Sequence, residues 1–192
     1  MELQKINVKV FTAEPNQVPL TDFIDIFHGW IQATDGVYHD VADYSHMQAG
    51  PGIVLVAADA NVSIDETGNR RGLLYSQKSR LGGSNLEKLS TVLRSALETC
   101  QRLEEEPALD GKLRFAGNEL EIVMNDRLVA PNTEKTFDEI RFDVDLLARR
   151  LYATTNFTLL RARQDPRRRF NMAIRTLLSF ETKTLLNNLQ VI

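Results

Sequence analysis

The chain has 192 residues, of which 43% are hydrophobic and 26% are charged, and its formal net charge is −3. These values are ordinary for globular domains and argue against disordered, fibrous and membrane-spanning classes. The net charge is too small to steer the protein toward a strongly charged partner. We therefore expect one globular domain over residues 1–192, in which residues 177–192 form a C-terminal tail.

The compartment is indicated by three features of the sequence. The longest unbroken apolar run, residues 53–58, is far shorter than the roughly 20 residues that a membrane-spanning helix needs. The first residues, MELQKINVKVF, alternate charged and apolar side chains, unlike a signal peptide. Cys100 is the single cysteine, so no internal disulfide or cysteine-based metal site is available. We expect a soluble, cytoplasmic protein with no membrane partner.

The first third of the chain predicts two strands and a helix. Residues 6–11 alternate apolar and polar side chains, which is typical of a half-buried strand. Apolar residues at spacings of three and four then predict a short amphipathic helix over residues 20–32. Residues 35–52 read as a loop that leads into the uninterrupted apolar run 53–56. Such a run predicts a central strand that is covered on both faces.

The middle of the chain predicts a hairpin and a long helix. Residues 62–65 and 73–75 alternate on either side of a turn. Ser84 and Glu87 have the spacing of a capping box, in which each side chain accepts a hydrogen bond from the other residue's backbone N–H. A helix is therefore predicted from Asn85 to just before Pro107, with one continuous apolar stripe.

The last third predicts two more pairs of strands and another helix. Residues 113–115 and 120–124 alternate around Gly117 and Asn118, which predicts a hairpin. Thr136 and Glu139 repeat the capping-box spacing before a second apolar stripe that reaches Tyr152. The final predicted pair of strands comprises residues 157–159 and 170–174, joined by a turn that contains Pro166.

Together these elements predict an α+β fold, with a mainly antiparallel mixed sheet and helices packed on one face. The order helix, strand, strand occurs three times, beginning near Thr21, Ser84 and Thr136. The fold could therefore consist of three helix–hairpin units. No residue identity between the units supports an internal duplication, and an ordinary α+β sandwich would give the same rhythm.

All three histidines lie between positions 28 and 46, among several aspartates. Imidazole and carboxylate groups are common metal ligands, and the same pair can act as a general base and its orienting partner. Their spacing does not fix whether they converge, because residues at intervals of three align on a helix and diverge on a strand. The alternative is a solvated loop without chemistry. The candidate site residues are His39, Asp40, Asp43 and His46.

Basic residues gather on the last predicted hairpin, and they form a candidate anion site. Arginine side chains on a β-ribbon can pair with phosphates. The protein is acidic overall and carries no recognisable nucleic-acid motif, so we do not expect a nucleic-acid partner. Pairing with acidic surface of the same or a neighbouring subunit is the alternative. The candidate residues are Arg161, Arg163, Arg167, Arg168 and Arg169.

The tail ends in LLNNLQVI, and we expect its apolar side chains to be buried against another part of the protein or a second subunit. If the tail is helical, Leu178, Leu185, Leu189 and Ile192 fall on one stripe. This stripe could contribute to a homo-oligomer, with a dimer as the default, or it could pack on its own subunit.

No nucleotide-binding loop, zinc signature or nucleophile elbow is present in the sequence. The leading hypothesis is an intracellular binding or assembly protein with the loop 35–52 as its best candidate site. Its small-molecule ligand and cofactors are unknown. The alternative is a metal-assisted hydrolase or related enzyme that uses the His/Asp-rich loop 35–52. The two hypotheses differ in whether those side chains converge on one point.

Overall fold

A computed structural model describes residues 1–14, 18–161 and 165–190 of the chain. Its strands form one eight-stranded sheet in the order β2-β3-β4-β5-β1-β6-β8-β7, and every pairing is antiparallel. The predicted α+β class is therefore confirmed. The strands are β1 (Ile6–Thr12), β2 (Tyr38–Tyr44), β3 (Gly52–Ala57), β4 (Ala60–Asp65), β5 (Gly72–Gln77), β6 (Phe115–Met124), β7 (Phe157–Arg161) and β8 (Phe170–Thr176).

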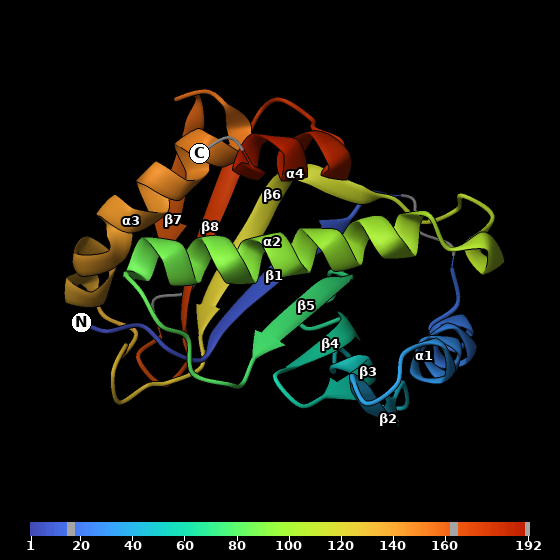
Figure 1. The fold of residues 1–192 in the computed structure, drawn as a ribbon. Helices are drawn as coiled ribbons and strands as arrows, with labels where there is room; N and C mark the ends of the chain where they lie inside the picture. The colour runs from blue at the N-terminus through green and yellow to red at the C-terminus, as the bar shows by residue number, and fades with distance from the viewer. Residues whose placement is uncertain (15–17, 162–164, 191–192) are drawn as a thin grey trace.

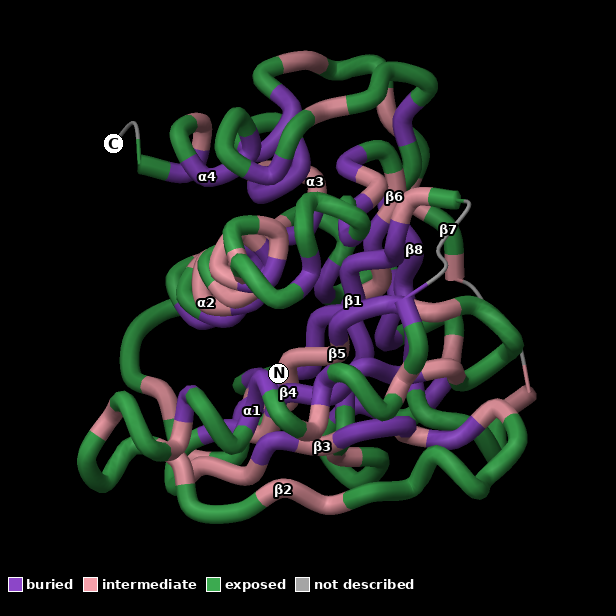
Figure 2. The backbone as a smooth tube through the Cα atoms, turned by 90° about the vertical axis from the view of Figure 1, so that its right-hand side faces the viewer, coloured by how far each residue is buried: buried purple, intermediate pink, exposed green. Residues whose placement is uncertain are grey.

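The helices are α1 (Asp22–Ala33), α2 (Asn85–Glu104), α3 (Glu134–Tyr152) and α4 (Thr182–Gln190), with a 3-10 turn at Pro107–Leu109. In Figure 1, α2 crosses the sheet, and α3 and α4 lie beside it. α2 contacts β1 and β5, α3 contacts β7 and β8, and α1 contacts β2 and β3. The strand residues that enter the common core all lie on the same face, so the helices cover one face of the sheet, as predicted (Figure 2).

The long helix α2 begins as the capping box predicts. The Ser84 side chain accepts a hydrogen bond from the Glu87 backbone N–H, and the Glu87 carboxylate accepts one from the Ser84 backbone N–H. The predicted apolar stripe is buried, including Leu93 at 0% exposed. α3 begins earlier than predicted, because Thr133, and not Thr136, caps it by accepting a hydrogen bond from the Thr136 backbone N–H.

The prediction of a central strand at residues 53–56 was wrong. β3 lies second from an edge of the sheet, and Val54 and Val56 are partly exposed on the face without helices. The strand between β5 and β6 is β1, and it is buried at every position. The alternation in β1 predicts one solvated face. Instead, the polar side chains Asn7 and Lys9 are buried beneath other polar groups.

The predicted hairpin around Gly117 was also wrong, because β6 runs unbroken from Phe115 to Met124. Glycine in a strand often marks a turn, but it can also mark the close approach of another segment. Here a Cβ at Gly117 would collide with the backbone carbonyl of Phe180, in the connection to α4. The glycine allows this connection to cross the strand.

Residues 35–52 are not a simple loop, because β2 forms the outer strand beside β3. The three helix–hairpin units do not recur either. Along the described chain, α1 is followed by four strands, α2 by one and α3 by two. The order of helices and strands in the sequence is therefore that of an ordinary α+β sandwich.

The tail forms α4 and packs on its own chain against α2, α3 and β6. Leu185, Leu186 and Leu189 are buried there, at 1%, 5% and 7% exposed. Of the predicted stripe, Leu178 lies before the helix and is exposed, and Ile192 lies outside the described residues. The stripe therefore covers the protein's own core. None of the helices in the described ranges is long and apolar enough to cross a membrane.

Candidate functional site

The face of the sheet that carries no helices is polar at its centre. β1 turns Ile6, Val8 and Val10 into the helix-covered core, so Asn7 and Lys9 lie on the opposite face. Both are nevertheless buried, at 2% and 4% exposed. They are covered because the loops after β4 and before β8 border the same hollow. This hollow is the best candidate site in the molecule.

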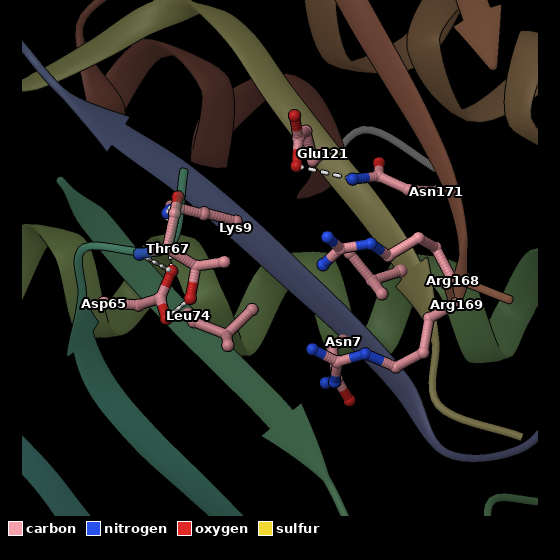
Figure 3. Close-up of a pocket in the computed structure, with 10 residues that line it drawn as sticks. Asn7, Lys9, Asp65, Thr67, Leu74, Glu121, Arg168, Arg169 and Asn171 are labelled. Atoms are coloured by element: carbon pink, nitrogen blue, oxygen red, sulfur yellow. Dashed lines mark hydrogen bonds and ion pairs between the residues drawn. The ribbon is translucent and has the colours of Figure 1, made fainter. Parts of the chain in front are cut away.

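We call the hollow the polar cavity (Figure 3). Its volume is about 120 Å³. Strands β1, β4, β5, β6 and β8 form its floor, and the two loops form its rim. Apart from two apolar side chains, every lining residue is charged or carries a hydrogen-bonding side chain. The lining residues are Asn7, Lys9, Asp65, Thr67, Leu74, Glu121, Val123, Arg168, Arg169 and Asn171.

Lys9 and Asp65 form a buried ion pair on the floor, with 2.5 Å between the Nζ and Oδ2 atoms. The Lys9 ammonium also donates to the carbonyl oxygens of Thr67 and Arg70, at 3.2 and 2.7 Å. Asp65 accepts further hydrogen bonds from the Thr67 backbone N–H and hydroxyl. All three ammonium hydrogens are therefore used, and this pair holds the loop between β4 and β5 on the sheet.

The other side of the cavity contains acceptors whose hydrogen bonds are incomplete. Asn171 donates its amide N–H to Glu121 Oε2 at 2.7 Å, but its own Oδ1 is buried without a partner in the described chain. The Oδ1 atom of Asn7 is likewise buried without a hydrogen-bond partner in the described chain. In the strand register, Asn7 and Asn171 both pair with Val123 of β6, so they flank one residue on the same face.

Two cationic side chains stand at the rim, and Figure 3 shows them extending from the loop before β8 toward β6 and β1. Arg169 donates to Asn125 Oδ1 at 3.2 Å, outside the cavity. The guanidinium group of Arg168 forms no hydrogen bond or ion pair with any side chain in residues 1–14, 18–161 and 165–190. Arg168 can therefore bind an anion without breaking a hydrogen bond or ion pair that the described residues form, although it attracts the nearby Asp165 carboxylate.

Farther along the same face, Glu119 holds two arginines together. It accepts hydrogen bonds from Arg70 at 2.8 and 3.0 Å, and one from Arg175 at 3.0 Å. Burial alone would raise the pKa of Glu119, but the two guanidinium groups outweigh this effect and the pKa lies below its ordinary value. The Arg70 guanidinium also stacks over the Phe11 ring at 3.7 Å. These groups satisfy one another and have a structural role.

The predicted histidines and aspartates do not form a site of this kind. His39, Asp40 and Asp43 lie on the outer strand β2, His46 lies in the turn after it, and all four are exposed. Hydrogen bonds from the Ser45 hydroxyl and backbone N–H hold the pKa of Asp43 below its usual value, so Asp43 caps the turn. Among the residues described, no three His, Cys, Asp or Glu side chains are placed to hold a metal ion.

The predicted arginine group is divided. Arg168 and Arg169 line the polar cavity. Arg161 turns toward α3 instead, pairing with Glu134 at 3.2 Å, and Arg167 pairs with Asp165 at 3.1 Å in the turn. Arg163 lies outside the described residues. The part of the basic hairpin that remains available for a ligand is therefore the Arg168 and Arg169 pair.

Two other features of the molecule are weaker candidates for a functional site. Cys100 is fully buried under α2, and burial raises the pKa of its thiol, so it is a core residue as the apolar stripe predicts. A cleft of about 560 Å³ lies between the start of β2 and α2. Two of its half-buried polar groups are paired, since Arg102 stacks on Trp30 at 3.8 Å and donates to the Tyr38 hydroxyl at 3.3 Å.

The sequence analysis missed most of the polar cavity. Asn7, Lys9, Asp65 and Glu121 occupy the polar positions of alternating strands, which predict a solvated face. A signal was present in the sequence, because polar residues recur at alternate positions of several neighbouring strands. It could be interpreted only when the order and register of the strands were known.

Comparisons with protein-family models, with curated proteins and with solved structures gave no match for this chain.

Proposed function

We propose that this chain is a binding protein and that it holds a small polar ligand in the polar cavity. The observation that supports the proposal is that, among the described residues, the buried oxygens Asn7 Oδ1 and Asn171 Oδ1 lack hydrogen-bond partners and the Arg168 guanidinium has no ion pair in the same cavity. A buried acceptor without a partner costs roughly 1–3 kcal/mol. Natural proteins retain such costs chiefly where function requires them.

Binding is a better proposal than catalysis for this geometry. The alternative hydrolase would need His39, Asp40, Asp43 and His46 to converge on a metal or a water molecule. Their dispersal over an outer strand and an exposed turn supports the binding hypothesis. The polar cavity contains no histidine, cysteine or serine among its lining residues, and its Thr67 hydroxyl and Lys9 ammonium both donate to Asp65. Its groups are therefore better suited to hold a ligand than to attack one.

Replacing Asn7 by leucine tests whether the cavity is kept for a ligand. In the ligand-free protein we expect Asn7→Leu to raise the free energy of unfolding by about 1–3 kcal/mol, because it removes a buried acceptor that has no partner. Urea denaturation measures the change. Asn188 is the matched control, because its amide donates to the Leu151 carbonyl at 2.8 Å. Asn188→Leu should lower stability. A loss of stability in Asn7→Leu would mean that Asn7 serves the fold, and the proposal would fail.

Self-assembly is a second candidate, favoured by an apolar surface beside the outer strand β7. Leu177 is fully exposed, and Leu178 and Leu160 are 54% and 45% exposed. Together with Phe157 they line a hollow of about 850 Å³. β7 has a neighbour, β8, on one side only. We therefore propose a two-fold dimer formed through this surface, and not through the buried stripe of α4.

Sedimentation velocity at micromolar concentration tests the dimer. We expect the full chain to sediment as a dimer and the double variant Leu177→Ser/Leu178→Ser to sediment as a monomer, because the substitutions remove exposed apolar surface without touching the core. Leu128→Ser is the control. Leu128 is 97% exposed, but it follows the C-terminal end of β6 and is not part of the apolar surface beside β7. A monomeric full-length protein would overturn the proposal. A truncation after Thr176 would not test it, because it would remove α4 from the core.

A further inference from the structure

We infer that the ligand of the polar cavity is a small zwitterion, a compound of the α-amino-acid class with a primary ammonium group and a carboxylate. The inference rests on the proposed function and adds the chemical class of the ligand. It follows from the separation of hydrogen-bond acceptors and donors within one cavity. Acceptors occupy the floor between β1, β6 and β8, and donors occupy the rim before β8.

The available groups on the floor are acceptors. Among the described residues, Asn7 Oδ1 and Asn171 Oδ1 have no hydrogen-bond partner, but both atoms are shielded from solvent. The acceptor open to a ligand is Glu121, which uses Oε2 for the Asn171 amide. Lys9 does not compete as a donor, because its three hydrogens already go to Asp65 and to two carbonyl oxygens. A primary ammonium group carries three donors and no acceptor. It therefore complements the Glu121 carboxylate, which lines the cavity beside Asn171.

The rim has the opposite character. Arg168 and Arg169 carry only donors, and the Arg168 guanidinium is unpaired in the part of the chain that the structure describes. A guanidinium group binds a carboxylate through two parallel hydrogen bonds. Because the Lys9 and Asp65 charges neutralise each other, the other charged side chains that line the cavity are Glu121 at the floor and the two arginines at the rim. A ligand that carries both a positive and a negative charge can therefore pair with Glu121 and with an arginine at the rim.

The size of the cavity restricts the ligand further. Its volume of about 120 Å³ is small, so we expect the smallest amino acids to fit it best. Leu74 and Val123 supply the apolar wall that a methyl or methylene group would contact.

Isothermal titration calorimetry of the full chain with a panel of probes tests the ligand class. The probes are glycine, alanine, methylammonium, acetate and trimethylglycine, which keeps both charges but has no N–H donor. We expect glycine or alanine to bind at least tenfold more tightly than the other three, because each of those lacks one half of the match. Side-chain amide NMR signals of Asn7 and Asn171 should shift only with the probes that bind.

Two variants locate the binding. Arg168→Gln should weaken glycine or alanine at least tenfold, and Glu121→Gln should weaken it similarly, because each removes the charge that faces one end of the ligand. The control is Arg167→Gln, since Arg167 is 88% exposed and pairs with Asp165 outside the cavity. The control should bind as the wild-type protein does. Unchanged affinity in Arg168→Gln would overturn the inference.

The other outcomes separate the ligand class from the proposed function. If acetate binds as tightly as glycine, and Arg168→Gln abolishes its binding, the ligand is a simple anion; the zwitterion is then wrong and the cavity remains a binding site. Equal affinity for trimethylglycine would refute the ammonium contact. If no probe binds or shifts the amide signals, the zwitterion is refuted and the buried oxygens are satisfied by water. The stability of Asn7→Leu then decides the proposed function independently.

Discussion

Replacing Asp65 by asparagine is expected to lower the free energy of unfolding by about 3–5 kcal/mol. The Lys9 and Asp65 side chains are 5% and 4% exposed, so removing the carboxylate charge leaves an ammonium group buried without its counter-ion. The loop between β4 and β5 would also lose an acceptor for its Thr67 groups. Urea denaturation followed by circular dichroism measures the loss.

A double variant distinguishes the cost of an unpaired charge from the value of the pair. Lys9→Met/Asp65→Leu should be more stable than either single variant, because no charge is then left in the interior. The exposed pair of Asp145 and Arg149 serves as the matched control, with side chains 33% and 50% exposed. Asp145→Asn should cost only about 0.3–0.5 kcal/mol. Costs that add in the double variant at residues 9 and 65 would contradict this explanation.

Replacing Gly117 by alanine should destabilise the protein by about 3 kcal/mol or more, at the upper end of the range for overpacking. The new methyl group would meet the Phe180 carbonyl group, whose carbon lies 2.8 Å from the Cβ position. Backbone cannot rotate away as a side chain can, so either β6 or the connection to α4 must move. Thermal or urea unfolding measures the effect.

Gly82→Ala is the matched control for this prediction, because a Cβ there has no atom within 4 Å. It should be neutral or slightly stabilising, since alanine reduces the conformational entropy of the unfolded chain. If Gly117→Ala also proves neutral, the close crossing of β6 by the segment at Phe180 is wrong. The position of α4 over the core would then need revision as well.

Local patterns in the sequence were sufficient to predict most of the elements. The apolar stripe and the capping box at Ser84 and Glu87 fixed α2, because a helix is stabilised by contacts between residues three and four positions apart. Alternation predicted β1, β4, β5, β7 and β8 for the same reason, since the side chains of a strand point to opposite faces in turn. These elements together were enough to predict an α+β fold with one helix-covered face.

Long-range contacts decided the points where the predictions failed. An apolar run such as residues 53–56 looks the same in a central strand and in one next to the edge, because the pattern does not state which strands pair. Gly117 resembles a turn residue until Phe180, 63 positions later in the chain, is seen to cross it. His39, Asp40 and Asp43 of β2 are close in sequence, but neighbouring residues of a strand face opposite sides, so no metal-binding cluster forms among the residues described.

The sequence by itself determined which residues are polar on each strand, and it predicted a candidate anion site that includes the arginines before β8. Only the tertiary structure decided that Asn7, Glu121 and Asn171, from three different strands, line one cavity with Arg168 and Arg169. The physical reason is that alternation assigns a side chain to a face of the sheet but not to a neighbour. The neighbours are set by strand order and register, which depend on the packing of the whole core.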